Sequence, residues 1–493
     1  MDCESGDGAF VIRSLGGTEI QAGTCLEVAI CSAETGEPVR KILVDIGGST
    51  NRNGGYVLPT DVDDVLVSHG HFDHYGNLVR LLYSLGGKSP NVVMSSETYA
   101  ILPSAIRNAE KLRKAKNSAG RARWAVERID ENKLIVADGE FIEIGTALGP
   151  LRIEAYEQPE GYEHLPGQLS FRISQGGLSF STGFDIYAQI TGNEEFDEEH
   201  FAQFGRLHAD IHAGEMTTAY KPLDLNDRSE NEERYVEAVK SAMLRLNSTK
   251  EKGCLVLPHF ALGRFHRGIA LIEDAIKRSG IPREELDCVV RAGLGVKYTA
   301  VDGSPFADSF ETLIGNFSNP ADWCYAFPDE KLHVAVVSPG FCQAGESKSL
   351  LDAVMTGNIK YGQGGIVILN SVYAPEDSPL HEMLTRGTYK GEKIPGGTFD
   401  VFSLSGHPMC GEAYGRIIDA VAPGVLFPVH GSPRAVDAYE RIANARGYTC
   451  GENLFFPEPG AALVACKKDG VLRTKYLGAG ADFSGAVREL ARS

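Results

Sequence analysis

The sequence predicts an α/β fold with more than one domain, and two observations lead to this prediction. The chain has 493 residues, which is more than a single hydrophobic core usually serves. In its second half, short apolar runs typical of buried strands alternate with helical stretches, which is the pattern of α/β proteins. The apolar run 254–257 and the helical stretch 268–278 illustrate this alternation.

The first half opens with β structure. Strand-like runs at 9–13, 25–30 and 41–44 are separated by glycine-rich turns. A further strand candidate, 62–67, runs directly into a cluster of histidines. We expect helical structure over about 77–85 and over 98–129, a stretch rich in Ala, Arg, Lys and Glu. Strands are then expected at 134–136, 141–144, 151–156 and 169–173.

The second half contains one polar stretch, 224–234, which we interpret as a domain boundary or an exposed loop. Beyond it we expect a helix over 235–246 and buried strands at 333–337 and 365–369. The final third repeats the pattern, with strands expected at 399–404 and 424–429 and helices at 412–420 and 433–445.

Composition limits the classes of function. Hydrophobic residues make up 43% and charged residues 23% of the chain, as in soluble globular proteins. No apolar run approaches the roughly 20 residues that cross a bilayer, and the acidic N-terminus lacks the apolar core of an export signal. We therefore expect a cytoplasmic protein without membrane contact. The ten cysteines form no C-x-x-C pair, which favours free thiols.

The net charge of −18 argues against a protein that holds nucleic acid through a broad basic surface. It does not exclude a nucleic-acid substrate. Any phosphate binding must then be local, through metal ions, backbone amides and a few arginines.

The strongest chemical signal is the run from His69 to His74, which reads His-Gly-His-Phe-Asp-His. Only 13 histidines occur in the chain, and three of them lie here beside Asp73. Imidazole and carboxylate groups suit zinc, manganese or iron. His69 and His71 can project to one side of an extended backbone, while Asp73 and His74 diverge from each other and can serve a second ion. A solvated histidine-rich loop is the alternative, but the carboxylate and the strand before the run favour a metal site.

The spacing H-x-H-x-D-H resembles the signature of the metallo-β-lactamase superfamily, whose fold is an αββα sandwich. Asp45, after the strand KILV, resembles the aspartate that orients the site in that superfamily. His164 in EHLPGQLSF resembles its third motif. Asp185 in STGFD resembles its bridging aspartate, although Phe184 stands between Gly183 and the acid. Taken singly, His164 and Asp185 would read as turn residues; their order along the chain favours ligands.

Later blocks resemble the β-CASP branch of the superfamily, whose members hydrolyse nucleic acids; ribonuclease J and the cleavage and polyadenylation endonuclease are examples. The blocks are short but occur in the expected order. They contain Glu215 in HADIHAGEMT, Arg264 in LPHFALGRFHRGIALI, Ser338 in VVSPGFCQAGES, Ser405 and His407 in FSLSGHPMCGE, and His430 in LFPVHGSP.

The resemblance implies a role for each of these residues. Two divalent ions, zinc or alternatively manganese, would share Asp185 and bridge the hydroxide that attacks the substrate. His407 and Glu215 would protonate the leaving oxygen, with Asp73 also catalytic. Arg264, Ser338 and Ser405 would contact phosphate. The first ion would take His69, His71, His164 and Asp185, and the second Asp73, His74, Asp185 and His430.

Other interpretations of these residues stay open. Glu215 could be an acid at a helix N-terminus, Arg264 could pair with a structural carboxylate, and the two serines could be turn residues. His208 and His212 lie four residues apart, as in a helical metal pair, but the segment reads as a strand, so we expect them to be structural.

The expected organisation is a metallo-β-lactamase domain formed by residues 1–210 and 390–493, with a β-CASP-like α/β domain inserted at 211–389. The expected function is a ribonuclease, since a histidine at the position of His430 accompanies RNA-acting members of the branch. RNA is thus the favoured partner over DNA, and a homodimer is possible. The alternative is a hydrolase of DNA or of a small ester, thioester or phosphate ester. A non-catalytic scaffold is disfavoured because every ligand position is filled.

Overall fold

The computed structural model divides the chain into two compact units, each described by itself. One comprises Met1–Leu225 with Gly406–Ser493, and the other Asn226–Ser405. His164, Ser405, His407 and the strand expected at 399–404 lie outside the described residues. The structure describes residues 8–17, 23–48, 56–112, 117–159, 165–222, 228–248, 252–259, 264–291, 311–312, 319–323, 327, 331–338, 345–356, 366–367, 378–393 and 410–493.

The first unit contains two sheets. The larger has the strand order β21-β20-β1-β2-β3-β4-β5-β6 and the smaller β19-β11-β10-β9-β8-β7. The strands of the larger sheet are β1 (Gly8–Gly16), β2 (Cys25–Ser32), β3 (Pro38–Val44), β4 (Asp64–Leu66), β5 (Asn91–Met94), β6 (Lys133–Ile135), β20 (Ala462–Lys468) and β21 (Val471–Leu477). Those of the smaller are β7 (Phe141–Thr146), β8 (Gly149–Glu157), β9 (Leu169–Gln175), β10 (Leu178–Gly183), β11 (Ile211–Gly214) and β19 (Val425–Leu426).

The two sheets share one apolar core. Phe10 and Leu26 of the larger sheet lie in the same buried cluster as Phe171 and Phe180 of the smaller one. Strand β8 shows how the sequence directs this packing, because its buried side chains alternate with more exposed ones along the strand. Since alternate side chains of a strand point to opposite faces, such a strand turns its apolar face to the opposite sheet.

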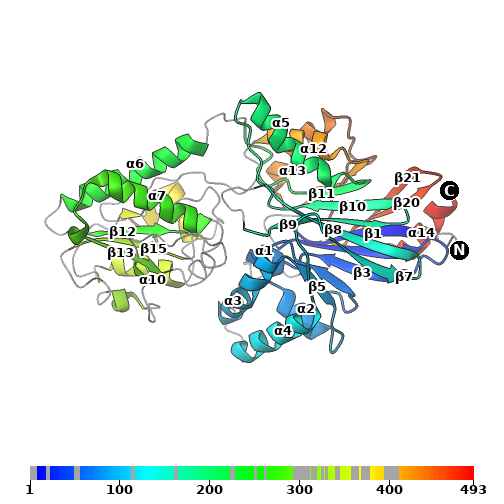
Figure 1. The fold of residues 1–493 in the computed structure, drawn as a ribbon, viewed down its shortest axis with the longest axis horizontal. Coiled ribbons are helices and arrows are strands. Elements are labelled where there is room, and N and C mark those ends of the chain that lie inside the picture. The colour runs from blue at the N-terminus through cyan, green and yellow to red at the C-terminus, as the bar shows by residue number, and fades with distance from the viewer. Residues whose placement is uncertain are drawn as a thin grey trace. The chain divides into compact units, whose positions relative to one another are not determined.

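Helices cover the outer faces of both sheets (Figure 1). On the larger sheet lie α1 (Phe72–Tyr75), α2 (Leu78–Ser84), α3 (Ser96–Leu112) and α4 (Ser118–Asn132), and on the smaller α5 (Glu194–Ala202), α12 (Gly411–Val421) and α13 (Pro433–Asn444). This arrangement is the αββα sandwich that the sequence predicted, and the fold class is confirmed.

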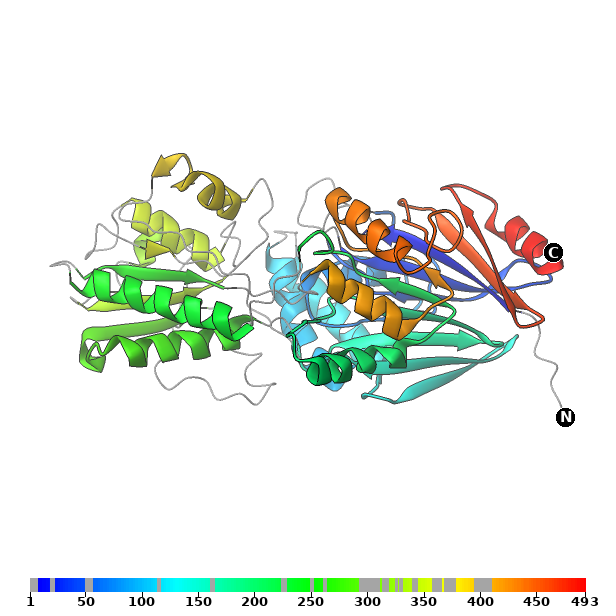
Figure 2. The same cartoon turned by 90° about the horizontal axis from the view of Figure 1, so that it is seen from above.

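Residues 462–493 complete the larger sheet, although the sequence analysis assigned no structure to them. β20 pairs antiparallel with β1, and β21 pairs with β20. Helix α14 (Phe483–Arg492) packs on these strands through Ala486 and Val487, and Figure 2 shows it beside them at the C-terminal end.

The second unit has a five-stranded sheet in which every described pairing is parallel, with the order β14-β13-β15-β12-β16. Its strands are β12 (Cys254–Pro258), β13 (Leu286–Arg291), β14 (Glu311–Thr312), β15 (Leu332–Val337) and β16 (Ile366–Val367). Its principal helices are α6 (Arg228–Asn247), α7 (Arg264–Ser279), α10 (Gly345–Met355) and α11 (Pro379–Arg386). Parallel strands joined through helices are the α/β pattern expected from the sequence.

The two compact units do not begin and end where the sequence analysis placed the domains. Strand β11, expected to open the inserted domain at 211, pairs with β10 and β19 and so belongs to the first unit. The hairpin β17–β18 (Thr388–Tyr389 and Glu392–Lys393) lies in the second unit, because Tyr389 is buried in that unit's core and donates to Asp352. The second unit therefore extends beyond residue 389.

The polar stretch 224–234 is not a loop throughout. Helix α6 already begins at Arg228, and its acidic residues form ion pairs with α7, between Glu232 and Arg267 and between Glu233 and Arg278. The polar composition thus reflects the charged surface of a helix, so the loop interpretation is wrong for 228–234. The alternative, a domain boundary, agrees with the division of the two units between Leu225 and Asn226.

The described cysteines carry free thiols, and all of them except Cys450 are buried. Among the described residues, no helix is both long enough and apolar enough to span a membrane.

Candidate metal centre

The histidine run forms the loop after β4 and the short helix α1, and a second loop at residues 45–48 holds it. Backbone amides of the second loop donate to carbonyls of the first: Ile46 N to His74 O at 2.7 Å and Gly48 N to Phe72 O at 3.0 Å. Thr24 N also donates to Asp73 O at 2.7 Å. The backbone of the run is therefore fixed by its neighbours, which positions its side chains before any ligand binds.

Gly47 allows this close approach of the two loops. A Cβ atom there would lie 1.7 Å from Asp73 O and 2.4 Å from Gly23 Cα. Both neighbours are backbone atoms that cannot rotate away. The packing therefore requires a glycine at this position.

We expect Gly47→Ala to lower the free energy of unfolding of the metal-free protein by about 1–3 kcal/mol, the usual cost of overpacking. Urea unfolding in EDTA measures this value. The matched control is Gly145→Ala, because a Cβ at that glycine meets nothing within 4 Å. Equal stability of the two variants would contradict the packing argument.

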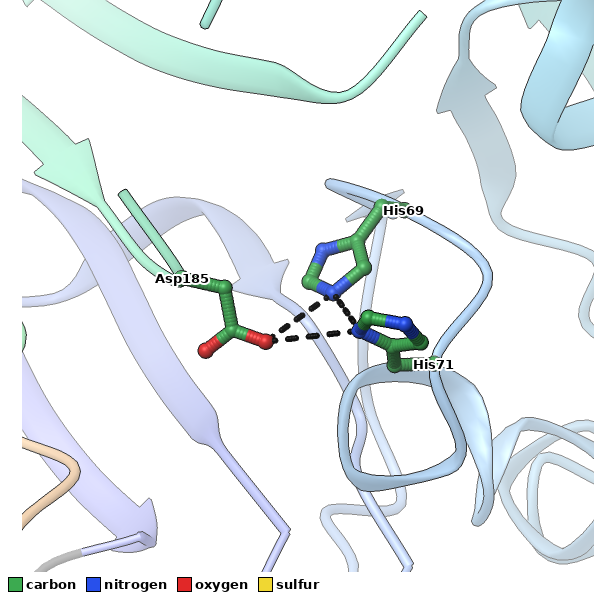
Figure 3. A group of neighbouring side chains, drawn as sticks. All are labelled: His69, His71 and Asp185. Atoms are coloured by element: carbon green, nitrogen blue, oxygen red, sulfur yellow. Dashed lines mark hydrogen bonds and ion pairs between the residues drawn. The ribbon is translucent and has the colours of Figure 1, made fainter. Parts of the chain in front are cut away.

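Three side chains form the first group of potential ligands (Figure 3). His69 Nε2 lies 2.9 Å from His71 Nδ1. Asp185 Oδ2 lies 3.2 Å from His69 Nε2 and 3.5 Å from His71 Nδ1. These atoms converge on one point, as ligands of a single ion do.

A second group consists of Asp73, His74 and His430. Asp73 Oδ2 lies 3.9 Å from His74 Nε2 and 3.4 Å from His430 Nε2. Asp185 reaches this group too, because its Oδ2 lies 3.3 Å from His74 Nε2 and its Oδ1 lies 3.8 Å from His430 Nδ1. Asp185 therefore lies between the two groups, where an aspartate shared by two ions has to lie.

Asp45 and Ser68 contact the Nδ1 atoms of His69 and His74, on the side of each ring away from Nε2. Ser68 donates its hydroxyl to Asp45 Oδ2 at 2.8 Å, so the hydroxyl is left to accept from His69 Nδ1, 2.9 Å away. Asp45 Oδ2 also lies 2.7 Å from His74 Nδ1 and accepts its proton. In the neutral form of both rings the proton therefore lies on Nδ1 or is held away from Nε2, and Nε2 is the atom that can bind a metal. Asp45 was predicted from the sequence, whereas Ser68 was not, although its position between the strand and His69 was an available signal.

Three residues of the site have left-handed backbone conformations. The φ angles are +57° at Asp45, +50° at Asp185 and +54° at His430. Such angles are uncommon outside glycine and cluster where a side chain must point in a required direction. The residue before Asp185, Phe184, has its ring buried in the core between the sheets.

Two buried glutamines, both missed in the sequence, support the turn that carries Asp185. Gln158 donates to Phe184 O at 2.8 Å, and Gln168 donates to Asp185 O at 2.9 Å. Gln168 also donates to the side-chain oxygen of Gln158 at 3.2 Å. The extra residue between Gly183 and Asp185 is therefore accommodated by a turn with its own hydrogen bonds.

The surroundings favour positive charge at His74 but not at His69. Burial lowers the pKa of His74, but Asp185, Asp45 and Asp73 outweigh it and hold that pKa well above its usual value. Burial, with the neighbouring His74, lowers the pKa of His69 to about 3. His74 Nε2 is buried and makes no hydrogen bond within the described part of the chain. The arrangement of imidazoles and carboxylates, with this buried nitrogen, fits divalent metal ions.

Comparisons with known proteins agree with this geometry. Residues 39–182 match the model of the metallo-beta-lactamase superfamily. The chain contains a metallo-β-lactamase domain. The superfamily expected from the sequence is confirmed for this part of the chain.

Two further likenesses concern more of the chain. It is 22% identical over 409 residues to "Endoribonuclease YSH1" of Mycosarcoma maydis, covering 78% of this chain and 43% of that protein. The chain thus spans less than half the length of this curated relative, whose likeness supports the β-CASP branch. A crystal structure of a protein of unknown function from Enterococcus faecalis V583 matches with a TM-score of 0.52 at 13% identity, covering 95% of this chain and 100% of that one. At this identity it shows the fold alone.

Thr217 fixes the ring of His430 in the metallo-β-lactamase domain. Its hydroxyl donates to His430 O at 2.9 Å and so accepts from His430 Nδ1, also 2.9 Å away. His430 Nε2 is then the atom that faces Asp73.

We expect Thr217→Val to weaken binding of one metal ion about tenfold, the lower end of the effect of removing a ligand's supporting partner. Competition with a chelating dye measures the affinity. Thr217→Ser keeps the hydroxyl and is the control. If both variants bind metal as tightly as the unchanged protein, the hydroxyl does not orient His430.

Three further predicted residues, Glu215, Arg264 and Ser338, are described by the structure, and they do not all lie in the same unit. Glu215 lies within the metallo-β-lactamase domain, where its Oε1 accepts from Ile186 N at 2.6 Å and where it forms a third potential ligand group with Asp185 and His430. Arg264 begins α7, and Ser338 follows β15, where its carbonyl accepts from Ser347 N; both belong to the second unit.

His208 and His212 make the structural contacts expected of them. His208 Nδ1 lies 2.9 Å from Val421 O, and the buried His212 lies 2.9 Å from the hydroxyl of Ser181. Neither belongs to a ligand group among the described residues.

Proposed function

We propose that this chain is a ribonuclease that hydrolyses phosphodiester bonds with two divalent ions, zinc or alternatively manganese. One observation carries the proposal: Asp185 lies between two groups of histidines and aspartates, within 3.8 Å of each. The printed name of the curated relative, an endoribonuclease, supports RNA as the substrate. A cytoplasmic location is compatible with such a substrate.

The ligands in this proposal are the residues whose atoms converge. The first ion would be held by His69, His71 and Asp185, with His164, which lies outside the described residues, as a further ligand. The second would be held by Asp73, His74, Asp185 and His430. When bound, such ions polarise a phosphate and lower the pKa of water. The chain's own contribution is to hold the ligand atoms in place through Asp45, Ser68 and Thr217, which leave the correct nitrogen of each ring available.

Departure of the 3′-oxygen requires a proton, which we assign to His407 with Glu215 as its partner. A carboxylate keeps an imidazole charged and oriented near neutral pH. Glu215 is 3% exposed and is held by Ile186 N, so it can serve as a fixed acceptor. Arg264, Ser338 and Ser405 are assigned to phosphate binding.

The test compares cleavage of labelled RNA, labelled DNA and a chromogenic phosphodiester with added Zn²⁺ or Mn²⁺. We expect RNA to be cleaved, and we expect Asp73→Ala to abolish that cleavage. His407→Ala should lower it by about 10²–10⁴-fold, the range for a general acid, without loss of metal. RNA cleavage that persists in Asp73→Ala would overturn the proposal.

The net charge of −18 favours one competing function, hydrolysis of a small ester, thioester or phosphate ester. Its signature in the same assay is cleavage of the chromogenic diester that His407→Ala leaves unchanged, with no action on either polymer. Cleavage of DNA but not RNA would identify the chain as a deoxyribonuclease, the other alternative.

A further inference from the structure

Helices α2 and α4 present an exposed aromatic pair that takes no part in the metal centre. The rings of Tyr83 and Trp124 lie 4.3 Å apart with their planes inclined by 35°. The side chain of Tyr83 is 45% exposed, and Trp124 is half-buried. The second tryptophan of the chain, Trp323, is by contrast fully buried. Figure 1 shows α2 and α4 beside each other on the outer side of the larger sheet.

Arginines flank this pair. The guanidinium carbon of Arg121 lies 5.0 Å from the ring centre of Tyr83, and that of Arg128 lies 5.8 Å from a ring of Trp124. Residues 121, 124 and 128 share one face of α4, because side chains three and four positions apart are neighbours. The buried carboxylate of Glu110 holds Arg121 at 3.1 Å. Arg128 is paired in turn with Glu131 at 3.1 Å. The result is a row of flat groups in which carboxylates hold the guanidinium groups beside the rings. We call it the aromatic row: Tyr83, Trp124, Arg121 and Arg128.

Two exposed arginines border the aromatic row. Arg80 precedes Tyr83 by one turn of α2, and Arg123 adjoins Trp124 on α4. Within the described part of the chain, Arg123 has no ion pair or hydrogen bond. Its charge is therefore available to a partner.

The charge of this region is opposite to that of the chain. Residues 77–133 contain 11 Lys and Arg against five Asp and Glu, a net of +6, whereas the whole chain carries −18. An acidic protein repels nucleic acid in general, so a local basic region with exposed rings is the place where a polyanion is attracted. A surface that only buried aromatic rings against an apolar partner would not need arginines around those rings.

We propose that the aromatic row binds single-stranded RNA, with bases stacked on Tyr83 and Trp124 and phosphates held by Arg80 and Arg123. This inference rests on the proposed function, since it concerns the same substrate. Stacking platforms edged by cations are the general means of holding single strands. Tyr83 follows His74 by nine residues, and both belong to the same compact unit.

The test measures binding of a fluorescein-labelled 20-nucleotide oligouridine to the full chain in EDTA, so that no cleavage occurs. We expect Trp124→Ala to weaken binding about five- to hundredfold, the effect of removing one stacked base. Arg123→Glu should weaken binding as well and lower the slope of log affinity against log salt by about one or more. Because Arg123 is exposed, this variant tests the surface without disturbing the core.

The matched control is Phe141→Ala. Phe141 is 48% exposed, and Arg152 lies 3.7 Å from its ring on strands β7 and β8, so it is an equivalent cation–aromatic pair elsewhere on the same unit. A direct readout is the fluorescence of Trp124 in a Trp323→Phe variant, which stacked bases should quench.

Unchanged affinity in both Trp124→Ala and Arg123→Glu would overturn the inference, as would equal weakening in Phe141→Ala. A change of molecular mass in light scattering with unchanged RNA affinity would identify the row as a contact between copies of the chain and would also overturn it. The proposed function has its own test, because it is overturned if the metal-loaded protein does not cleave RNA. If RNA cleavage depends on Asp73 but Trp124→Ala and Arg123→Glu bind RNA normally, the proposed function stands and only RNA binding by the aromatic row is overturned.

Discussion

Asp185→Ala is expected to lower cleavage of RNA at least about a thousandfold, equivalent to ~4 kcal/mol of transition-state stabilisation. The physical reason is that Asp185 contacts both ligand groups through four distances of 3.8 Å or less. Its removal therefore weakens the binding of both ions at once, whereas loss of a ligand that contacts one ion weakens the binding of that ion only. The measurements are the initial rate of cleavage and the metal content of the dialysed protein by mass spectrometry.

Asp210→Ala is the matched control for this variant. Asp210 lies in the same unit and accepts from Ser179 N at 2.9 Å and from Lys467 Nζ at 2.9 Å, so its loss removes comparable bonds without touching the centre. We expect Asp210→Ala to retain its metal and its activity. An Asp185→Ala protein that still holds as much metal as the unchanged chain would contradict a bridging role.

The local pattern of the sequence was sufficient for much of the first sheet. The apolar runs at 9–13, 25–30 and 41–44 became β1, β2 and β3, because strands with a buried face carry their own periodic signal. Strands β10 and β20 were not assigned. β10 reads Leu-Ser-Phe-Ser-Thr-Gly, and its Ser and Thr are also typical of turns.

Long-range pairing explains only part of the other omission. β21 follows β20 through the turn Asp469-Gly470, a local hairpin signal that was not used in the sequence-based assignment. The other partner of β20 is β1, more than 440 residues earlier in the chain. Such pairing depends on tertiary context and leaves no sign in a short window of sequence. The same limit applies to domain boundaries, since the assignment of β11 depends on its partners β10 and β19 and not on its own residues.

The candidate site divides in a similar way. Residues with unusual chemistry in a short motif, such as His69 to His74, could be predicted from the sequence. The residues that hold them could not: Gln158, Gln168 and Thr217 are ordinary polar residues until the fold brings their side chains to a ligand. Their roles depend on hydrogen bonds to backbone carbonyls and ring nitrogens, which only the three-dimensional arrangement defines.

Substitution of Asp45 is expected to have the second large effect, because this residue supports both the fold and the metal centre. Its carboxylate is fully buried and accepts from Ser68 N and Ser68 Oγ, both at 2.8 Å, while also contacting His74 Nδ1 at 2.7 Å. Asp45→Ala leaves these groups buried without their acceptor. We expect a loss of about 3–5 kcal/mol in the free energy of unfolding of the metal-free protein, the cost of breaking a buried pair from one side, and a loss of metal affinity of about 10–100-fold.

Comparison with Asp45→Asn separates the causes of this loss. Asparagine tolerates the positive φ of +57° found at this position, whereas alanine does so less readily. Asparagine also keeps one oxygen, which can accept from Ser68 N, but not the negative charge that favours a proton on His74 Nδ1. If backbone conformation dominates, Asp45→Asn restores most of the stability, and urea unfolding in EDTA detects this. If the charge dominates, both variants lose metal affinity alike in chelator competition, even where asparagine restores folding. Unfolding curves and metal affinities identical to those of the unchanged protein in both variants would show that Asp45 supports neither the fold nor the metal centre.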